Sequence, residues 1–153
     1  MSREEVIRRI DDWETRLGDL CAQLDEWCDG LGPSVTRREG FIHQRVEDLM
    51  KRYGIEPRQL PTRAFFHENI RCAFVPSSIW VVAAMGRVNV TTNFQQHKLV
   101  DIRKEVRAPS EWHIASPDLN VDIQPFTREV FGNLVMTGRP VTDGVSARNP
   151  RGV

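Results

Sequence analysis

The sequence lacks a long apolar run, and none of its 153 residues belongs to an apolar stretch near the roughly 20 residues that a membrane-spanning helix needs. The first ten residues are charged and contain no apolar signal core. Cysteine is scarce, with three residues and no closely spaced pair. We therefore expect a cytoplasmic protein with reduced thiols and no membrane association.

Motifs that carry enzymatic or cofactor chemistry are also missing. The sequence contains no Gly-x-Ser-x-Gly nucleophile motif and no glycine pattern that cradles a dinucleotide or a phosphate. Its four histidines include no helical pair four residues apart and none beside a pair of cysteines, as a zinc site would require. We expect no cofactor, and a non-enzymatic role is favoured over an enzymatic one.

Two aspartates are the weak candidates for a metal site. Asp118 and Asp122 lie four residues apart around an expected strand end, and paired carboxylates can hold a magnesium ion. Asp118, however, follows Pro117 in an expected turn, where aspartate is favoured for local hydrogen bonding. A turn residue and a surface residue are the favoured interpretation, so the sequence predicts no metal site.

Opposite charges balance, with 21 basic and 21 acidic residues, so no overall field draws the chain toward nucleic acid or lipid. Arginine nevertheless outnumbers lysine by 18 to 3. One short segment collects basic residues and is interrupted by Asp101 and Glu105; its members are Lys98, Arg103, Lys104 and Arg107. This cluster motivates an alternative function, the binding or processing of nucleic acid.

The N-terminal segment carries the most specific pattern in the chain. Ser2 and Glu5 have the spacing of a capping box, and the glycines and proline after Asp29 predict the end of the helix. Along this helix the apolar residues recur at alternating steps of four and three. This heptad stripe consists of Val6, Ile10, Trp13, Leu17, Leu20, Leu24, Trp27 and Leu31.

A strict heptad is typical of a coiled-coil seam, although tryptophan is bulky for a two-stranded one. Two intramolecular alternatives stay open, because the stripe can also pack on a second helix or across a sheet of the same chain. The leading hypothesis is a non-enzymatic protein-binding module that self-associates through this helix, with a homodimer as the first guess. Another protein is a further plausible partner, and a small ligand held between Trp80 and Trp112 is a third possibility.

The end of this helix is acidic and contains no basic residue between positions 19 and 29, so we expect arginines from elsewhere to lie beside it. A second capping-box pattern at Thr36 and Glu39 predicts a helix through Tyr53, which would pair with the first helix as an antiparallel hairpin.

The chain then changes to β-branched and aromatic segments separated by short turns, which predicts antiparallel neighbours. We expect residues 78–84 to form a central strand, and Thr127 to begin a short C-terminal helix. The predicted fold is α+β: a helical hairpin over residues 1–54 as the oligomerisation element, an antiparallel domain of five or six strands with its closing helix over residues 55–136, and a flexible tail over residues 137–153.

Overall fold

The computed structural model describes residues 1–81, 83–105, 107–115 and 123–140. In this part of the chain, three helices and seven strands follow one another in a simple order. They are α1 (Arg3–Asp29), β1 (Val35–His43), α2 (Asp48–Tyr53), β2 (Gln59–His67), β3 (Ile70–Ser78), β4 (Arg87–Thr92), β5 (Gln96–Asp101), β6 (Trp112–Ala115), β7 (Gln124–Pro125) and α3 (Arg128–Thr137).

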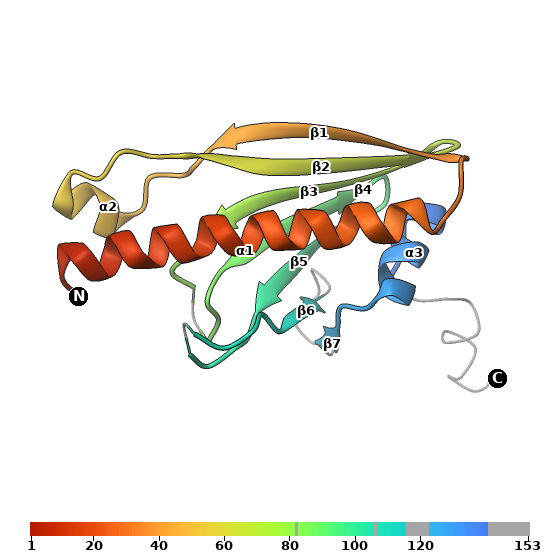
Figure 1. Ribbon diagram of the computed structural model, residues 1–153. Coiled ribbons are helices and arrows are strands. Elements are labelled where there is room, and N and C mark those ends of the chain that lie inside the picture. Colours follow the sequence, from red (N-terminus) through yellow and green to blue (C-terminus); the bar gives the residue numbers. More distant parts are fainter. Residues whose placement is uncertain (82, 106, 116–122, 141–153) are drawn as a thin grey trace.

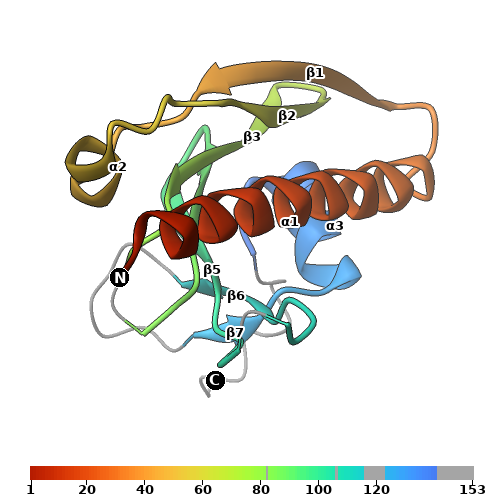
Figure 2. The same ribbon diagram turned by 60° about the vertical axis from the view of Figure 1, so that its left-hand side comes forward.

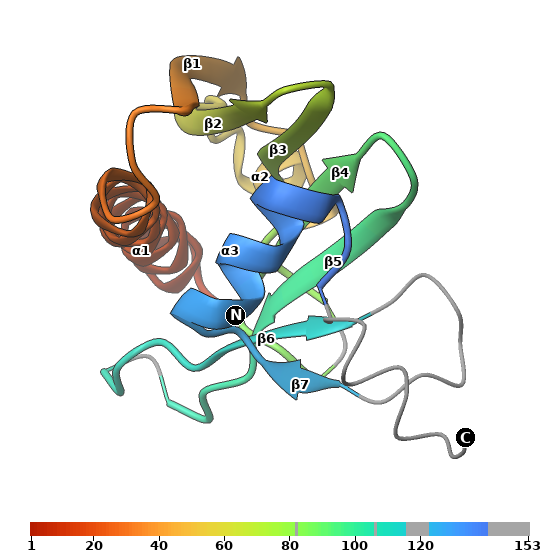
Figure 3. The same ribbon diagram turned by 90° about the vertical axis from the view of Figure 1, so that its right-hand side faces the viewer.

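The strands form one sheet in which each strand pairs antiparallel with the next along the chain. The sheet is strongly curved. Viewed nearly along α1, the strands follow an arc from β1 to β7, with α1 and α3 inside it (Figure 3). The predicted α+β class with an antiparallel sheet is confirmed, and the sheet has seven strands where five or six were expected.

Helix α1 begins and ends where the sequence predicts. The Ser2 hydroxyl accepts a hydrogen bond from the Glu5 backbone N–H at 3.2 Å, and the helix ends at Asp29. It runs beneath β1, β2 and β3 along most of the molecule (Figure 1). The arginines expected at its acidic end are present, because Arg63 binds Asp25 at 2.9 Å and Arg37 binds Asp29 at 3.3 Å.

The prediction of a second helix, which would form a hairpin with the first, is wrong over most of its length. Residues 35–43 form strand β1, which pairs with β2 over all nine residues, and only residues 48–53 are helical. The short helix α2 lies beside the N-terminal part of α1 (Figure 2). It contributes the fully buried Met50 to the core. Residues 54–58 form the connection between α2 and β2, which begins at Gln59.

The predicted strand over residues 78–84 is also wrong. Strand β3 ends at Ser78 after an irregularity in its pairing, and the described residues 79–81 and 83–86 form a loop. Two side chains hold this loop. The Glu47 carboxylate accepts hydrogen bonds from the backbone N–H groups of Ile79 and Trp80, and Arg9 donates to the Ile79 and Met85 carbonyls.

A single hydrophobic core joins the helices to the sheet. Val6, Ile10 and Leu24 of α1 share it with Phe65 of β2 and Phe131 of α3, and each of these five is completely buried. The core therefore includes residues on both sides of residue 54.

The closing helix α3 begins as predicted, because the Thr127 hydroxyl accepts a hydrogen bond from the Val130 N–H. Phe131 meets Phe65 edge-on at 5.0 Å between ring centroids, which fixes α3 against the sheet. Most of the predicted tail, residues 141–153, lies outside the described residues. Among the described helices, none is both long enough and apolar enough to cross a membrane.

Candidate functional site

The heptad stripe, which the sequence marks as the interaction surface, lies in the core of its own chain. Six of its members are at most 4% exposed: Val6, Ile10, Trp13, Leu17, Leu20 and Leu24. Trp27 is partly buried and packs on Phe126 and Phe131 at 5.6 and 5.8 Å. The curved sheet and α3 thus cover most of the seam along Trp13, Leu20 and Trp27.

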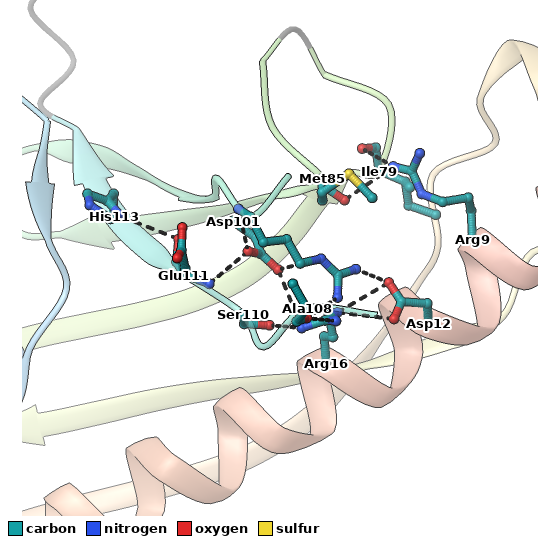
Figure 4. A network of polar contacts seen from close by, with 11 residues as sticks. Arg9, Asp12, Arg16, Ile79, Met85, Asp101, Ala108, Ser110, Glu111 and His113 are labelled. Atoms are coloured by element: carbon teal, nitrogen blue, oxygen red, sulfur yellow. Dashed lines mark hydrogen bonds and ion pairs between the residues drawn. The ribbon is translucent and has the colours of Figure 1, made fainter. Parts of the chain in front are cut away.

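Beside this stripe, α1 carries charged residues that reach into a buried ion-pair network (Figure 4). Arg16 binds Asp12, one turn before it, at 3.1 Å, and it also donates to the Ser110 hydroxyl at 2.5 Å and to the Ala108 carbonyl. Asp12 also pairs with Arg103. The network therefore ties α1 to the segment between β5 and β6.

Asp101, the last residue of β5, is the centre of this network. Its side chain is fully buried and lies 3.5 Å from Arg103 Nε and 4.0 Å from Arg16 Nη1. One carboxylate oxygen also accepts hydrogen bonds from the backbone N–H groups of Glu111, at 2.9 Å, and Arg103, at 3.3 Å. These contacts bind Asp101 to Arg103 near the start of the β5–β6 segment and to Glu111 near its end.

Burial raises the pKa of both carboxyl groups in the network. For Asp101 the loss of hydration is opposed by the Glu111 N–H and by Ser110, and for Asp12 it is opposed by Arg16 and Arg9. Two carboxylates and two guanidinium groups balance in charge, and Asp101 is closed to solvent. This arrangement joins α1 to the chain around Asp101, and the Asp101 carboxylate itself is out of reach of a substrate.

A hollow of about 370 Å³ lies next to the network, between α1 and β6. Its lining consists of Arg16, Asp19, Leu20, Gln23, Trp27, Ser110, Trp112 and Phe126. Of the two tryptophans expected as walls of a ligand site, Trp112 therefore lines this hollow. Trp80 is elsewhere, under the guanidinium of Arg9 at 5.8 Å from its ring centroid.

Strand β1 is the long edge of the sheet. Among the described residues only β2 pairs with it, so the other side of its backbone has no strand neighbour. Most of its side chains are exposed, including Phe41 at 72% and Ile42 at 39%. The opposite edge, β7, has only two residues, one of them Pro125. The sequence prediction missed this edge, because residues 36–43 were assigned to a helix.

The basic cluster of the nucleic-acid alternative is divided by the fold. Arg103 is 3% exposed and belongs to the ion-pair network, whereas Lys98 on β5 and Lys104 and Arg107 after it are exposed. Three exposed basic residues thus remain near Asp101 and Arg103, whose charges are already paired.

The weak metal candidates Asp118 and Asp122 lie outside the described residues. Within the described residues, no group of three or more histidine, cysteine or acidic side chains is placed to hold a metal ion. Cys21, Cys28 and Cys72 are free and buried, and burial raises the pKa of the Cys72 thiol to about 12 and that of Cys21 to about 11. Such thiols are poor nucleophiles at neutral pH.

Comparisons of the chain with protein-family models, with curated proteins and with solved structures found no match.

Proposed function

We propose that the protein is a non-enzymatic protein-binding module that self-associates by antiparallel pairing of β1 with β1 of a second copy. The observation that carries the proposal is the exposed edge of β1, which is nine residues long and pairs with β2 alone in the part of the chain that the structure describes. Unpaired strand edges are templates for a further strand, and proteins that do not use them keep them short, charged or covered. Strand β1 is long and uncovered, and its charges are of both signs. The proposed self-association surface is therefore β1 and not α1, because the heptad stripe of α1 is buried.

The charge pattern of β1 favours a second copy as the partner. In an antiparallel pair with a two-fold axis through Arg38, residues equally far before and after Arg38 lie opposite each other. Arg37 then lies opposite the partner's Glu39, and Glu39 lies opposite the partner's Arg37. Opposite charges across a strand pair are favourable. This register would add two such pairs to the ion pairs that Arg37 makes with Asp29 and that Glu39 makes with Arg63 in the same chain.

The same register places each Phe41 opposite the partner's Val35, and the symmetry repeats this pair on the other side of the axis. Val35 is 8% exposed and packs in the core of its own chain, so the partner strand covers Phe41 only in part. Partial covering of a phenylalanine that is 72% exposed contributes about 1 kcal/mol for each copy. Arg38 faces its own symmetry mate, but its guanidinium lies 5.6 Å from the Phe66 ring centroid, over β2 and away from the edge. The like charges are therefore drawn apart.

The experiment is a comparison of solution mass by light scattering for the wild type and for Phe41→Asp. We expect the wild type to have the mass of two chains. In the variant, a carboxylate replaces the apolar ring that the partner strand would partly cover, so we expect dissociation at concentrations where the wild type is dimeric. Phe41 lies outside the core, so the far-UV circular dichroism of the variant should be unchanged.

Ile123→Asp is the matched control, since Ile123 is 55% exposed and lies next to β7 at the other edge of the sheet. It should leave the mass at two chains. A wild-type protein that is monomeric at high concentration would refute the proposal, as would a Phe41→Asp variant that dimerises as strongly as the wild type.

A further inference from the structure

The hollow between α1 and β6 has aromatic walls. Trp112 lies on β6, and Trp27 packs against Phe126, the residue that follows β7. Leu20 and Phe126 are buried at 4% and 8% exposure, whereas Trp27 and Trp112 are partly exposed. A volume of about 370 Å³ is in the range of small-molecule sites.

The charges at this hollow favour a cation. Arg16 lines it, but its charge is balanced by Asp12 at 3.1 Å and Asp101 at 4.0 Å. Asp19 lies one turn further along α1 and is exposed, and no described residue forms an ion pair or a hydrogen bond with it. Gln23, the remaining polar residue of α1 in the lining, carries no charge. The mouth of the hollow therefore carries one uncompensated negative charge beside aromatic rings.

From these observations we infer that the hollow binds a small organic cation, a substituted ammonium ion whose apolar part lies against Trp27 and Trp112. The faces of tryptophan rings carry negative electrostatic potential and attract such cations, and the Asp19 carboxylate supplies the countercharge. A small anion would meet Asp19 without gaining Arg16, which is already bound. The site is independent of the proposed dimer, because β1 and β6 lie toward opposite ends of the arc (Figure 3).

The test is a titration followed by ¹H–¹⁵N NMR of the indole N–H signals, assigned with single tryptophan-to-phenylalanine variants. The probe is benzyltrimethylammonium. We expect saturable shifts of the Trp27 and Trp112 signals and no shift of Trp80, which is packed under Arg9 at a different place. Phenylacetate, an anion of similar shape, should give no saturable shift.

Asp19→Asn removes the countercharge without touching the core, and we expect it to weaken binding of the cation about fivefold. Asp29→Asn is the matched control, because Asp29 is an acidic residue of the same helix, is 76% exposed and does not line the hollow. It should leave the affinity unchanged. The inference is overturned if the cation causes no saturable shift of Trp27 or Trp112, if phenylacetate binds equally well, or if Asp19→Asn binds the cation as tightly as the wild type.

Discussion

At the scale of single residues, the apolar side chains of α1 lie in one core with residues of the sheet and of α3, among them Phe65 and Phe131. The steps of four and three correctly marked side chains that become buried. A heptad line winds slowly around a straight helix, by about 20° per repeat. A curved sheet can follow such a line as well as a second helix can, so spacing alone could not distinguish the two.

The ion-pair network left only a partial trace in the sequence. Asp12 and Arg16 are four residues apart, which predicts a local pair on the helix surface. Their other partners, Asp101 and Arg103, are some 90 residues away in the chain. No local sequence pattern predicts a contact between residues so far apart. Because its ion-pair partners could not be predicted, Arg103 was assigned to a nucleic-acid surface.

The burial of His97 leads to a prediction of how the stability of the fold depends on pH. Its side chain is fully buried on β5, and neither ring nitrogen has a hydrogen-bond partner among the described residues. Burial, and then the nearby Arg139 charge, lower the pKa of His97 below its ordinary value of 6.5. The unfolded chain therefore takes up a proton near pH 6.5 while the folded chain does not, so stability falls as the pH drops below that value.

We expect the free energy of unfolding in urea to fall by about 1 kcal/mol more for the wild type than for His97→Leu between pH 7 and pH 5. Val90→Ala is the control, because Val90 lies opposite His97 on β4 and is fully buried. This cavity variant should lower stability by a similar amount at both pH values. An identical pH-dependent loss in the wild type and in His97→Leu would show that His97 does not cause it.

At the scale of elements, the error over residues 35–43 has a physical reason. The pattern at Thr36 and Glu39 satisfies the local requirements of a helix start, and Ile42, Val46, Leu49 and Met50 have helical spacing. Isolated helices of this length are marginal, and tertiary pairing overrides them. Pairing with β2 over nine residues satisfies more backbone groups than the short helix would, and the helical spacing survives only in α2.

Two glycines predict opposite effects of the same substitution. Gly86 lies directly before β4, where a Cβ atom would overlap the ring of Trp13, which is itself 2% exposed. Gly18 lies in the middle of α1, with nothing within 4 Å of the position a Cβ would take. The absence of a Cβ at Gly86 thus lets the Trp13 ring of α1 pack directly on the backbone before β4. Gly18 has no such contact and only lowers the helix propensity of α1.

We expect Gly86→Ala to lower the free energy of unfolding by about 1 to 3 kcal/mol, since Trp13 must move within a packed core. Gly18→Ala should raise it by about 0.5 to 1 kcal/mol. Urea denaturation of both variants measures the two effects. Equal effects of the two substitutions would contradict the close packing of Trp13 on Gly86.

At the scale of the whole molecule, the fold class and the antiparallel order of the strands could be predicted, because short turns leave no room for crossover helices. The curvature of the sheet could not. It results from twist accumulated over seven strands and from the helices packed inside the arc, and neither is encoded in a local pattern. This curvature is what covers α1, whereas the strand order makes β1 an edge of the sheet.

The pairing of β1 across a two-fold axis at Arg38 is tested most directly by a single cysteine. Residues opposite each other in an antiparallel pair have Cα atoms about 4.5 to 5.5 Å apart, which is within disulfide reach. Arg38→Cys would place two thiols opposite each other at the axis. The three native cysteines are buried, and burial raises their pKa values, so the introduced thiol is the reactive one.

After mild oxidation, Arg38→Cys is expected to give a covalent dimer that reducing agent separates. Thr36→Cys should give none, because in this register Thr36 lies opposite the partner's Gly40 and the two introduced thiols would be about 13 Å apart along the strands. Efficient cross-linking at residue 38 and not at residue 36 is the predicted result. No cross-link at residue 38, or a stronger one at residue 36, would contradict the proposed pairing of β1.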